Sequence, residues 1–187
     1  HFGIPTISTG AILRKNIQEG TELGKLAKKY IDDGKLIPDD VMIKVMDSRL
    51  AEDDCKNGFI LDGFPRTLTQ AQELDKSHIK IDCVLNLNVA DEAIINRLSG
   101  RLECSKCAAT FHKIYRKPKT EGVCDLCGGK LVTRADDTPE TVKSRLSTYH
   151  TQTEPLLKFY KEKGLLKTVN GQDGIESTTR EVLKVLG

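Results

Sequence analysis

The chain has 187 residues, of which 38% are hydrophobic and 30% are charged, and its formal net charge is +2. This length and apolar content predict one compact core domain with small insertions. The near balance of charge argues against a general nucleic-acid or membrane-binding surface. No apolar run approaches the roughly 18 residues that span a bilayer, and the first residues lack the regions typical of a signal peptide. We therefore expect a cytoplasmic protein with no nucleic-acid or membrane partner.

The first third of the sequence predicts one strand and three helices. Residues 4–8 form a short β-like run, and the apolar residues that follow Thr9-Gly10 recur at helical spacing. Two more helices are predicted over residues 21–33 and 39–51, each bounded by glycine or proline.

Three later runs are short and almost wholly apolar, namely residues 58–63, 83–89 and 165–169. Such runs are typical of parallel strands that are covered on both faces. Because helical segments separate them, we expect an α/β fold with a parallel sheet flanked by helices. Ligands of such folds bind beyond the carboxyl ends of the strands, so the residues directly after each strand are the candidates for the site.

An insertion interrupts this alternation. Asp91 is a candidate cap for one helix, and Thr138-Pro139-Glu140 opens another. Between these helices, residues 102–137 follow neither the helical nor the strand period, and they hold four of the six cysteines. We expect this segment to fold on its own.

The cysteines of the insertion form two Cys-x-x-Cys pairs with 16 residues between them. Four thiolates at this spacing can close a tetrahedral zinc shell that leaves no open position, so the predicted site is structural. An insertion this small cannot bury enough apolar surface to hold itself together without such help. A degenerate site that binds no metal is the alternative. The expected Zn²⁺ ligands are Cys104, Cys107, Cys124 and Cys127.

The segment Asp62 to Thr67 begins with the acid and the glycine that close the apolar run 58–63. Asp62 could hold a magnesium-bound water, Gly63 lets a ligand approach the backbone, and Arg66 could bind a phosphate. A plain turn with a solvated arginine explains the segment equally well. Six arginines also recur where they could surround a phosphoryl group, although each alone could be a solvated helix charge. They are Arg14, Arg66, Arg97, Arg101, Arg134 and Arg145.

Five motifs occur in one order along the whole chain: Ile7-Ser8-Thr9-Gly10 with Leu13-Arg14, Gly34 to Pro38, Gly58 to Thr67 with Gln70, Gly100-Arg101, and Arg134 to Asp137 with Arg145. Together they resemble adenylate kinases of the long-lid type whose lid carries zinc. The sequence Asp-Gly-Phe-Pro-Arg-Thr is highly specific to nucleoside-monophosphate kinases. The resemblance implies a P-loop nucleoside-monophosphate-kinase-like parallel sheet with a zinc-ribbon lid. It also implies a monomer that transfers the terminal phosphate of ATP to AMP with Mg²⁺, giving two ADP.

The resemblance also implies which residues bind each nucleotide. The AMP-binding set, in which the glutamine reads the adenine edge, is Thr9, Arg14, Lys35, Leu36, Ile37, Gly63, Phe64, Pro65, Arg66, Gln70, Arg134 and Arg145. The ATP-binding set, in which Arg97 stacks on the adenine, is Arg97, Arg101, Thr110, Phe111, Gln172 and Asp173.

Its catalytic arginines surround the transferring phosphoryl group and are Arg66, Arg101, Arg134 and Arg145. Asp136 and Asp137 help to close the lid, and Asp62 lies near Mg²⁺ through water. The implied domains are a core of residues 1–99 and 138–187, an AMP-binding flap of residues 8–37 within it, and a zinc-binding lid of residues 100–137.

One departure from the family is large. Adenylate kinases begin with a strand, a Gly-rich phosphate loop ending in Gly-Lys and a first helix, ahead of the segment that resembles residues 1–5. No Gly-x-x-x-x-Gly-Lys-Ser/Thr pattern occurs in this chain. The strand is the middle one of the family's sheet, so we expect unpaired strand edges and exposed apolar surface here. We also expect this chain to be inactive alone.

Three other functions are compatible with the sequence. The first is a nucleoside-monophosphate kinase of another specificity, against which Gln70 and the long lid argue. The second is a zinc-ribbon module whose cations touch nucleic acid. The third is a catalytically silent fragment that binds AMP through its flap. The cationic and aromatic residues on which the second depends are Lys113, Tyr115, Arg116, Lys117 and Lys119.

Overall fold

The computed structural model describes residues 2–77, 79–172 and 174–187. The chain divides into two compact units, each made of two stretches of sequence. The first unit contains the residues up to 86 together with 147–167, and the second contains 87–146 together with 168–187. A search of the described helices finds none with the length and apolar character that crossing a membrane requires.

The first unit opens with a parallel strand pair. β1 (Thr6–Ser8) pairs with β2 (Ile60–Asp62), and Ser8 lies opposite Asp62. The predicted strands at residues 4–8 and 58–63 are therefore both confirmed in shortened form. α1 (Thr9–Glu19) begins directly at the end of β1.

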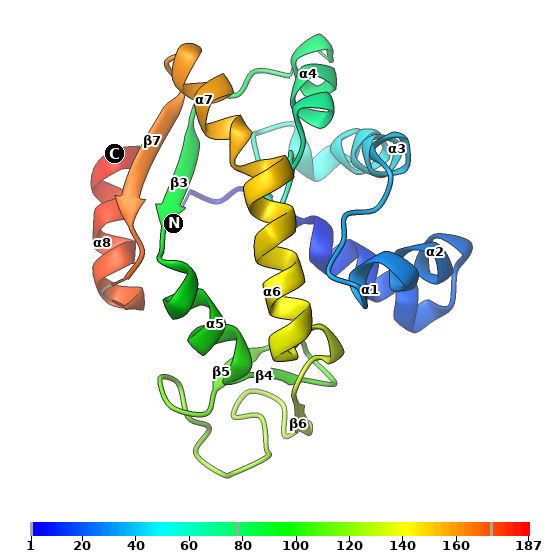
Figure 1. Cartoon of the computed structure of the whole chain (residues 1–187), viewed down its shortest axis with the longest axis vertical. Coiled ribbons are helices and arrows are strands. Elements are labelled where there is room, and N and C mark those ends of the chain that lie inside the picture. Colours follow the sequence, from blue (N-terminus) through cyan, green and yellow to red (C-terminus); the bar gives the residue numbers. More distant parts are fainter. Residues whose placement is uncertain (1, 78, 173) are drawn as a thin grey trace. The chain divides into compact units, whose positions relative to one another are not determined.

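α1 and α2 (Glu22–Ile31) form a helical hairpin (Figure 1). Gly20 ends α1 in the left-handed conformation, with φ of 66°, which glycine adopts at little cost. Thr21 caps α2 by accepting the backbone N–H of Gly24 at 3.0 Å. A Cβ atom at Gly24 would lie 2.1 Å from the backbone oxygen of Asn16. The close approach of the two helices therefore requires a glycine at position 24.

The main core of the first unit lies among these helices, α3 (Asp39–Leu50) and α4 (Leu68–Lys76). A short 3₁₀-helix, Asp53–Cys55, follows α3. The apolar stripes of the helices supply most of the buried side chains, as amphipathic spacing predicts. These are Ile7, Leu13, Ala27, Ile37, Met42, Met46, Cys55, Phe64 and Leu74.

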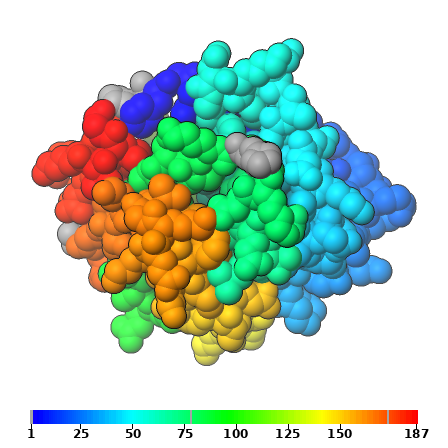
Figure 2. All heavy atoms as spheres, turned by 90° about the horizontal axis from the view of Figure 1, so that it is seen from above, coloured from blue at the N-terminus to red at the C-terminus, as the bar shows by residue number. Residues whose placement is uncertain are grey.

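A second, smaller cluster joins α4 to α7 (Pro155–Glu162), whose surfaces lie side by side in green and orange in Figure 2. Ala71, Leu156 and Tyr160 are its buried members, and Lys163 forms an ion pair with Asp75 beside it. Burial raises the pKa of the Tyr160 hydroxyl to about 12.

α6 (Pro139–Thr148) crosses from the second unit into the first and continues as a π-helix, Tyr149–Thr153. Pro155 occupies the first turn of the next helix, α7. Its missing N–H costs nothing there, because the first N–H groups of a helix have no partner within it.

The remaining parallel strands are β3 (Val84–Asn88) and β7 (Leu166–Asn170), which pair with each other and run in the same direction (Figure 1). The division between the units passes through both strands. α5 (Asp91–Ser99) and α8 (Ile175–Leu186) follow them. Asp91 is the first residue of α5, whereas the cap is Ala90, so the predicted cap was one residue too late.

The strands are less covered than the sequence suggests. Ile60 of β2 is 42% exposed and Leu87 of β3 is 51% exposed, so the prediction that these runs are buried on both faces is wrong for those residues. In the part of the chain that the structure describes, the parallel strands form two separate pairs, β1–β2 and β3–β7. Without further strands and helices packed against these pairs, some of their apolar side chains remain exposed to solvent.

The insertion folds as a small antiparallel sheet in the order β5-β4-β6, within the second unit. Its strands are β4 (Arg101–Cys104), β5 (Thr110–His112) and β6 (Leu131–Val132). The buried members of its own core are Cys104, Phe111, Cys124 and Leu131. The insertion therefore has a sheet and a small core of its own, whereas its independent folding and the domain boundaries expected from the family remain predictions.

Gly24 offers a direct test of the helical hairpin. Alanine normally favours a helix over glycine by about 1 kcal/mol, yet Gly24→Ala should lower the free energy of unfolding by about 1–3 kcal/mol, because overpacking against Asn16 outweighs propensity. Chemical denaturation monitored by circular dichroism measures the change. Lys25→Ala, an exposed change in the same helix, is the control. A stabilised Gly24→Ala variant would contradict the packing described here.

Candidate functional site

The first part of the candidate site lies at the carboxyl ends of β1 and β2. Thr9, only 2% exposed, follows β1, and its hydroxyl donates to the carbonyl oxygen of Gly63 at 2.9 Å. Gly63 has φ of 77°, and a Cβ atom on it would lie 2.6 Å from Nη2 of Arg66 and 2.8 Å from Oγ1 of Thr9. Glycine is therefore needed here both for its conformation and for its lack of a side chain. Three predicted AMP-binding residues, Thr9, Gly63 and Arg66, thus lie together.

The amino terminus of α1 makes this edge attractive to an anion. Ser8 is the N-cap, but its side chain makes no capping hydrogen bond, and the first turn has no acidic residue. The N–H groups of a helix's first turn carry partial positive charge and bind phosphate readily. Arg14 folds back over the same turn, since a Cβ atom on Gly10 would lie 3.0 Å from its Nη1. The arrangement suits a phosphate group.

Gln70 is held by a polar network next to this edge. It is 2% exposed, and its Oε1 accepts the backbone N–H of Arg66 at 2.8 Å. Its Nε2 donates to Oδ1 of Asp39 at 2.8 Å, while the Thr67 hydroxyl donates to Oδ2 of Asp39 at 3.0 Å. The sequence analysis missed Asp39, because an acid in the first turn of a helix ordinarily serves the helix itself.

The segment between α2 and α3 is irregular and holds the predicted Lys35, Leu36 and Ile37. Gly34 starts it with φ of 70°, and the Gly34 carbonyl oxygen accepts the Thr148 hydroxyl at 3.1 Å. Ile37 is buried in the core, as is the predicted Phe64, whereas Lys35 is exposed and pairs with a neighbouring aspartate.

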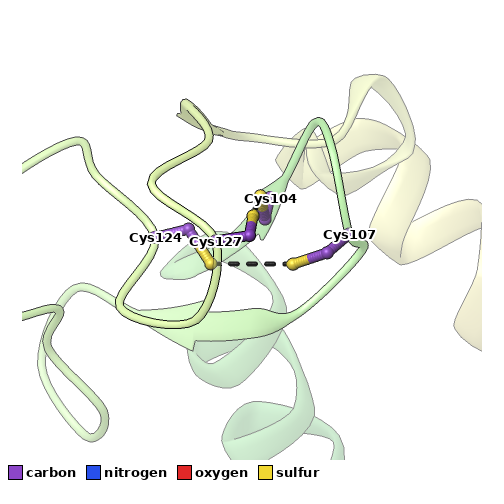
Figure 3. Close-up of side chains that lie close together, drawn as sticks. All are labelled: Cys104, Cys107, Cys124 and Cys127. Carbon is purple, nitrogen blue, oxygen red and sulfur yellow. Dashed lines mark hydrogen bonds between the residues drawn. The ribbon is translucent and has the colours of Figure 1, made fainter.

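The four cysteines of the insertion come together from two loops (Figure 3). Their sulfurs all lie within 4.8 Å of one another, with 3.5 Å between Cys104 and Cys127 and 3.7 Å between Cys107 and Cys124. Zn–S bonds of about 2.3 Å in a tetrahedron place sulfurs about 3.8 Å apart. The cluster therefore fits a structural zinc ion. This confirms the grouping predicted from spacing.

Backbone groups around the cluster favour the thiolate form of Cys104. Gly129 lies so near that a Cβ atom on it would be 2.8 Å from the Cys104 sulfur. The backbone N–H of Lys106 also points to that sulfur, at 3.4 Å. Backbone N–H groups, that of Cys107 above all, lower the pKa of Cys104 to about 6 against the opposing effect of burial. A stabilised thiolate is the form in which cysteine binds a metal.

In the second unit, carboxylates hold the predicted catalytic arginines. Arg101 donates through Nε and Nη2 to Asp137 at 2.8 and 2.5 Å. Arg145 donates through Nη1 to Asp136 at 3.1 Å and to Asp137 at 3.3 Å. The Asp137 side chain is fully buried. One carboxylate therefore links two of the four arginines, and a 3₁₀-helix, Ala135–Asp137, positions it.

The other two catalytic arginines have different settings. Arg134 forms an ion pair with Glu103 of β4, a partner that the sequence analysis missed. No local pattern marks that pair, because the residues lie far apart in sequence and meet only across the lid sheet. Arg66 belongs to the first unit, and its Nε donates to the Gly63 carbonyl oxygen at 2.9 Å.

The predicted ATP-binding residues lie in the second unit. Arg97 of α5 donates through Nη1 to the carbonyl oxygen of Gly171 at 2.7 Å and through Nη2 to that of Gln172 at 2.8 Å. Two of the predicted contacts, Arg97 and Gln172, are thus brought together, whereas Asp173 lies outside the described residues. Thr110 is exposed at the start of β5, and Phe111 is buried in the lid core. Asp62, the predicted magnesium-side acid, is exposed at the end of β2.

Comparison with known proteins gives a consistent answer. The sequence model described as "Adenylate kinase" matches residues 1–165. The chain is 58% identical to an adenylate kinase of Caldicellulosiruptor saccharolyticus, over 100% of this chain and 88% of the relative. It is 52% identical to those of Acetivibrio thermocellus, over 99% of this chain and 87% of the relative, and Methanosarcina barkeri, over 100% and 88%. The chain therefore belongs to the adenylate kinase family.

Proposed function

We propose that this chain supplies the AMP site, the lid and the catalytic arginines for reversible phosphoryl transfer from ATP to AMP, which gives two ADP. As a member of the adenylate kinase family it is a phosphotransferase with adenine nucleotides as its substrates. The observation that carries the residue assignment is the meeting of Thr9, Gly63 and Arg66 at the carboxyl edge of β1 and β2, where α/β folds bind their ligands.

AMP binds in the first unit in this proposal. Its phosphate faces the first turn of α1, Arg14 and Arg66, and its base meets Gln70. Lys35 to Ile37 and Phe64-Pro65 form the walls of the site. Support comes from the helix terminus without an acid, from the glycine that admits a close ligand, and from the fixed amide of Gln70. Arg134 and Arg145 would reach the same phosphate from the lid side.

Phosphoryl transfer needs little covalent help from a protein, because positioning and charge neutralisation dominate. We assign this work to Arg66, Arg101, Arg134 and Arg145. Their carboxylate partners support the assignment, since a guanidinium held at one edge keeps further N–H donors for a phosphate oxygen. Asp136 and Asp137 would keep Arg101 and Arg145 aligned as the lid closes.

The ATP base would stack on Arg97, whose guanidinium is already fixed by the carbonyl groups of residues 171 and 172. Arg101, Thr110 and Phe111 would complete this site, the buried Phe111 through its backbone. Magnesium, when bound with ATP, would neutralise phosphate charge. Asp62 is an exposed carboxylate at a strand end, which suits a contact to Mg²⁺ through water.

Two mobile parts would close over a fixed core in this proposal. Residues 8–37 are the flap that carries AMP, residues 100–137 are the lid that carries arginines, and residues 1–99 with 138–187 otherwise form the core. Closure excludes water and so strengthens each charge interaction with the phosphates. The self-contained lid sheet, with its own small core, supports this division.

The ATP phosphates would also need a Gly-rich loop, and no such pattern occurs in the sequence. We propose that a further strand with this loop completes the sheet. The two separate parallel pairs and the exposed Ile60 and Leu87 support the proposal. The 187-residue chain should then show negligible activity in a coupled ATP-plus-AMP assay. Fusion to the strand, loop and first helix of a related adenylate kinase should restore turnover, and full activity of the unfused chain would refute the proposal.

The arginine assignment predicts a specific kinetic defect. In the active fusion protein, Arg101→Lys should lower kcat on the order of 100-fold, because lysine keeps the charge but lacks the planar fork that binds Asp137 through two nitrogens and leaves Nη1 for a phosphate oxygen. Steady-state rates in both reaction directions measure the effect. Arg116→Lys, in the same lid, should change kcat less than twofold. Equal rates for the two variants would exclude Arg101 from the chemistry.

The zinc proposal separates stability from catalysis. Zn²⁺ analysis should find one ion per chain, and Cys104→Ser should release it and lower the melting temperature. Turnover of the active fusion protein at low temperature should fall much less, because the ion stabilises the lid without touching the nucleotides. Cys83→Ser, outside the cluster, is the control. A large loss of rate with an unchanged melting curve would contradict this division.

A further inference from the structure

The hydrogen bonds around Gln70 fix which end of its amide is oxygen and which is nitrogen. The Arg66 backbone N–H can only donate, so the atom facing it at 2.8 Å must be the amide oxygen. An ionised Asp39 can only accept, so the atom facing it at 2.8 Å must be the amide nitrogen. Both hydrogen bonds therefore require the same orientation of the Gln70 amide.

Asp39 is itself held in place for this task. Its second carboxylate oxygen accepts the Thr67 hydroxyl at 3.0 Å. That hydroxyl oxygen in turn accepts the backbone N–H of Gln70 at 3.2 Å, which caps α4. Every hydrogen in the network therefore has a defined direction. The amide of Gln70 still has one N–H and one oxygen lone pair beyond those used.

We propose that Asp39 determines the purine specificity of the AMP site, because it locks the Gln70 amide in the orientation that reads adenine. The inference rests on the proposed role of Gln70. Adenine offers an acceptor at N1 and a donor at its 6-amino group, whereas hypoxanthine and guanine offer a donor at N1 and an acceptor at O6. An amide that is locked one way matches only adenine.

A 6-oxopurine could be accepted only if the amide turned over. The turn would set the Gln70 oxygen against the Asp39 carboxylate and its nitrogen against the Arg66 N–H. Both contacts would lose their hydrogen bonds in a residue that is 2% exposed, where unpaired polar groups are costly. Asp39 therefore adds discrimination without touching the nucleotide, and it is a positioning residue.

An alternative role for Asp39 is purely structural, because its negative charge would stabilise the amino terminus of α3. Asp40, in the same first turn, serves that role equally well. Asp40 is exposed, and within the described residues it makes no hydrogen bond to Gln70. A comparison of Asp39 with Asp40 therefore separates the orientation of Gln70 from the stabilisation of the amino terminus of α3.

The experiment is isothermal titration calorimetry of AMP and IMP with the full chain, which requires no turnover. The ratio of the two dissociation constants, IMP over AMP, is the readout. Asp39→Ala should lower this ratio about tenfold, the size expected from one lost hydrogen bond to a charged group. Asp40→Ala should leave it within twofold. Asp39→Asn, which retains an acceptor oxygen, should recover most of the preference.

An unchanged ratio in Asp39→Ala would overturn the proposal, even if both nucleotides bound more weakly. If that variant does not fold by circular dichroism, Asp39→Ser replaces it, since serine suits a helix start but cannot reach Gln70. Gln70→Leu tests the underlying role separately. A retained AMP preference in Gln70→Leu would refute the role of Gln70, whereas its loss there and retention in Asp39→Ala would refute the role of Asp39 alone.

Discussion

The parallel pairing of β1 with β2 is the constraint on which the first half of the site depends. Because Ser8 lies opposite Asp62, the next residues of both strands leave the sheet at the same edge. Thr9 and Gly63 can therefore hydrogen bond although they are 54 positions apart. A shift of one residue in this register would turn Thr9 to the opposite side, and α1 would no longer present its amino terminus beside Gly63.

Carboxylates play the same physical role in both units, because each directs a side chain that is expected to meet a nucleotide. Asp39 directs the amide of Gln70, Asp137 directs two guanidinium groups, and Glu103 directs a third. These acids offer only acceptors, so each dictates which donor of its partner is used. Anionic substrates would be repelled by an acid placed in direct contact. Asp137 and Glu103 are instead neutralised by the guanidinium groups that they hold, and Asp39 is hydrogen bonded by the neutral groups of Gln70 and Thr67.

The sequence predicted what depends on local pattern. Helices α1 to α3, the four strands of the α/β part and the cysteine cluster follow from periodicity and spacing, and their bounds differ from the structure by a few residues at most. Asp39 and Glu103 could not be found this way. Their partners Gln70 and Arg134 are 31 positions away in each case, and each acid resembles an ordinary surface charge in sequence. The predicted burial was wrong for Ile60 of β2 and Leu87 of β3. An apolar run in the sequence indicates residues that tend to be buried, whereas the neighbouring strands and helices decide whether they are.

The lid shows why a metal and an ion-pair network occur in one small element. The core of the lid has four buried residues, three of them on its short strands, which is too few to fix a sheet of this size by apolar burial alone. Four thiolates around zinc would tie the two cysteine loops together. The arginines then need only local acids to orient them, because the sheet beneath them is already fixed. Zinc would thus supply the stability of the sheet, and the acids would align the arginines on it.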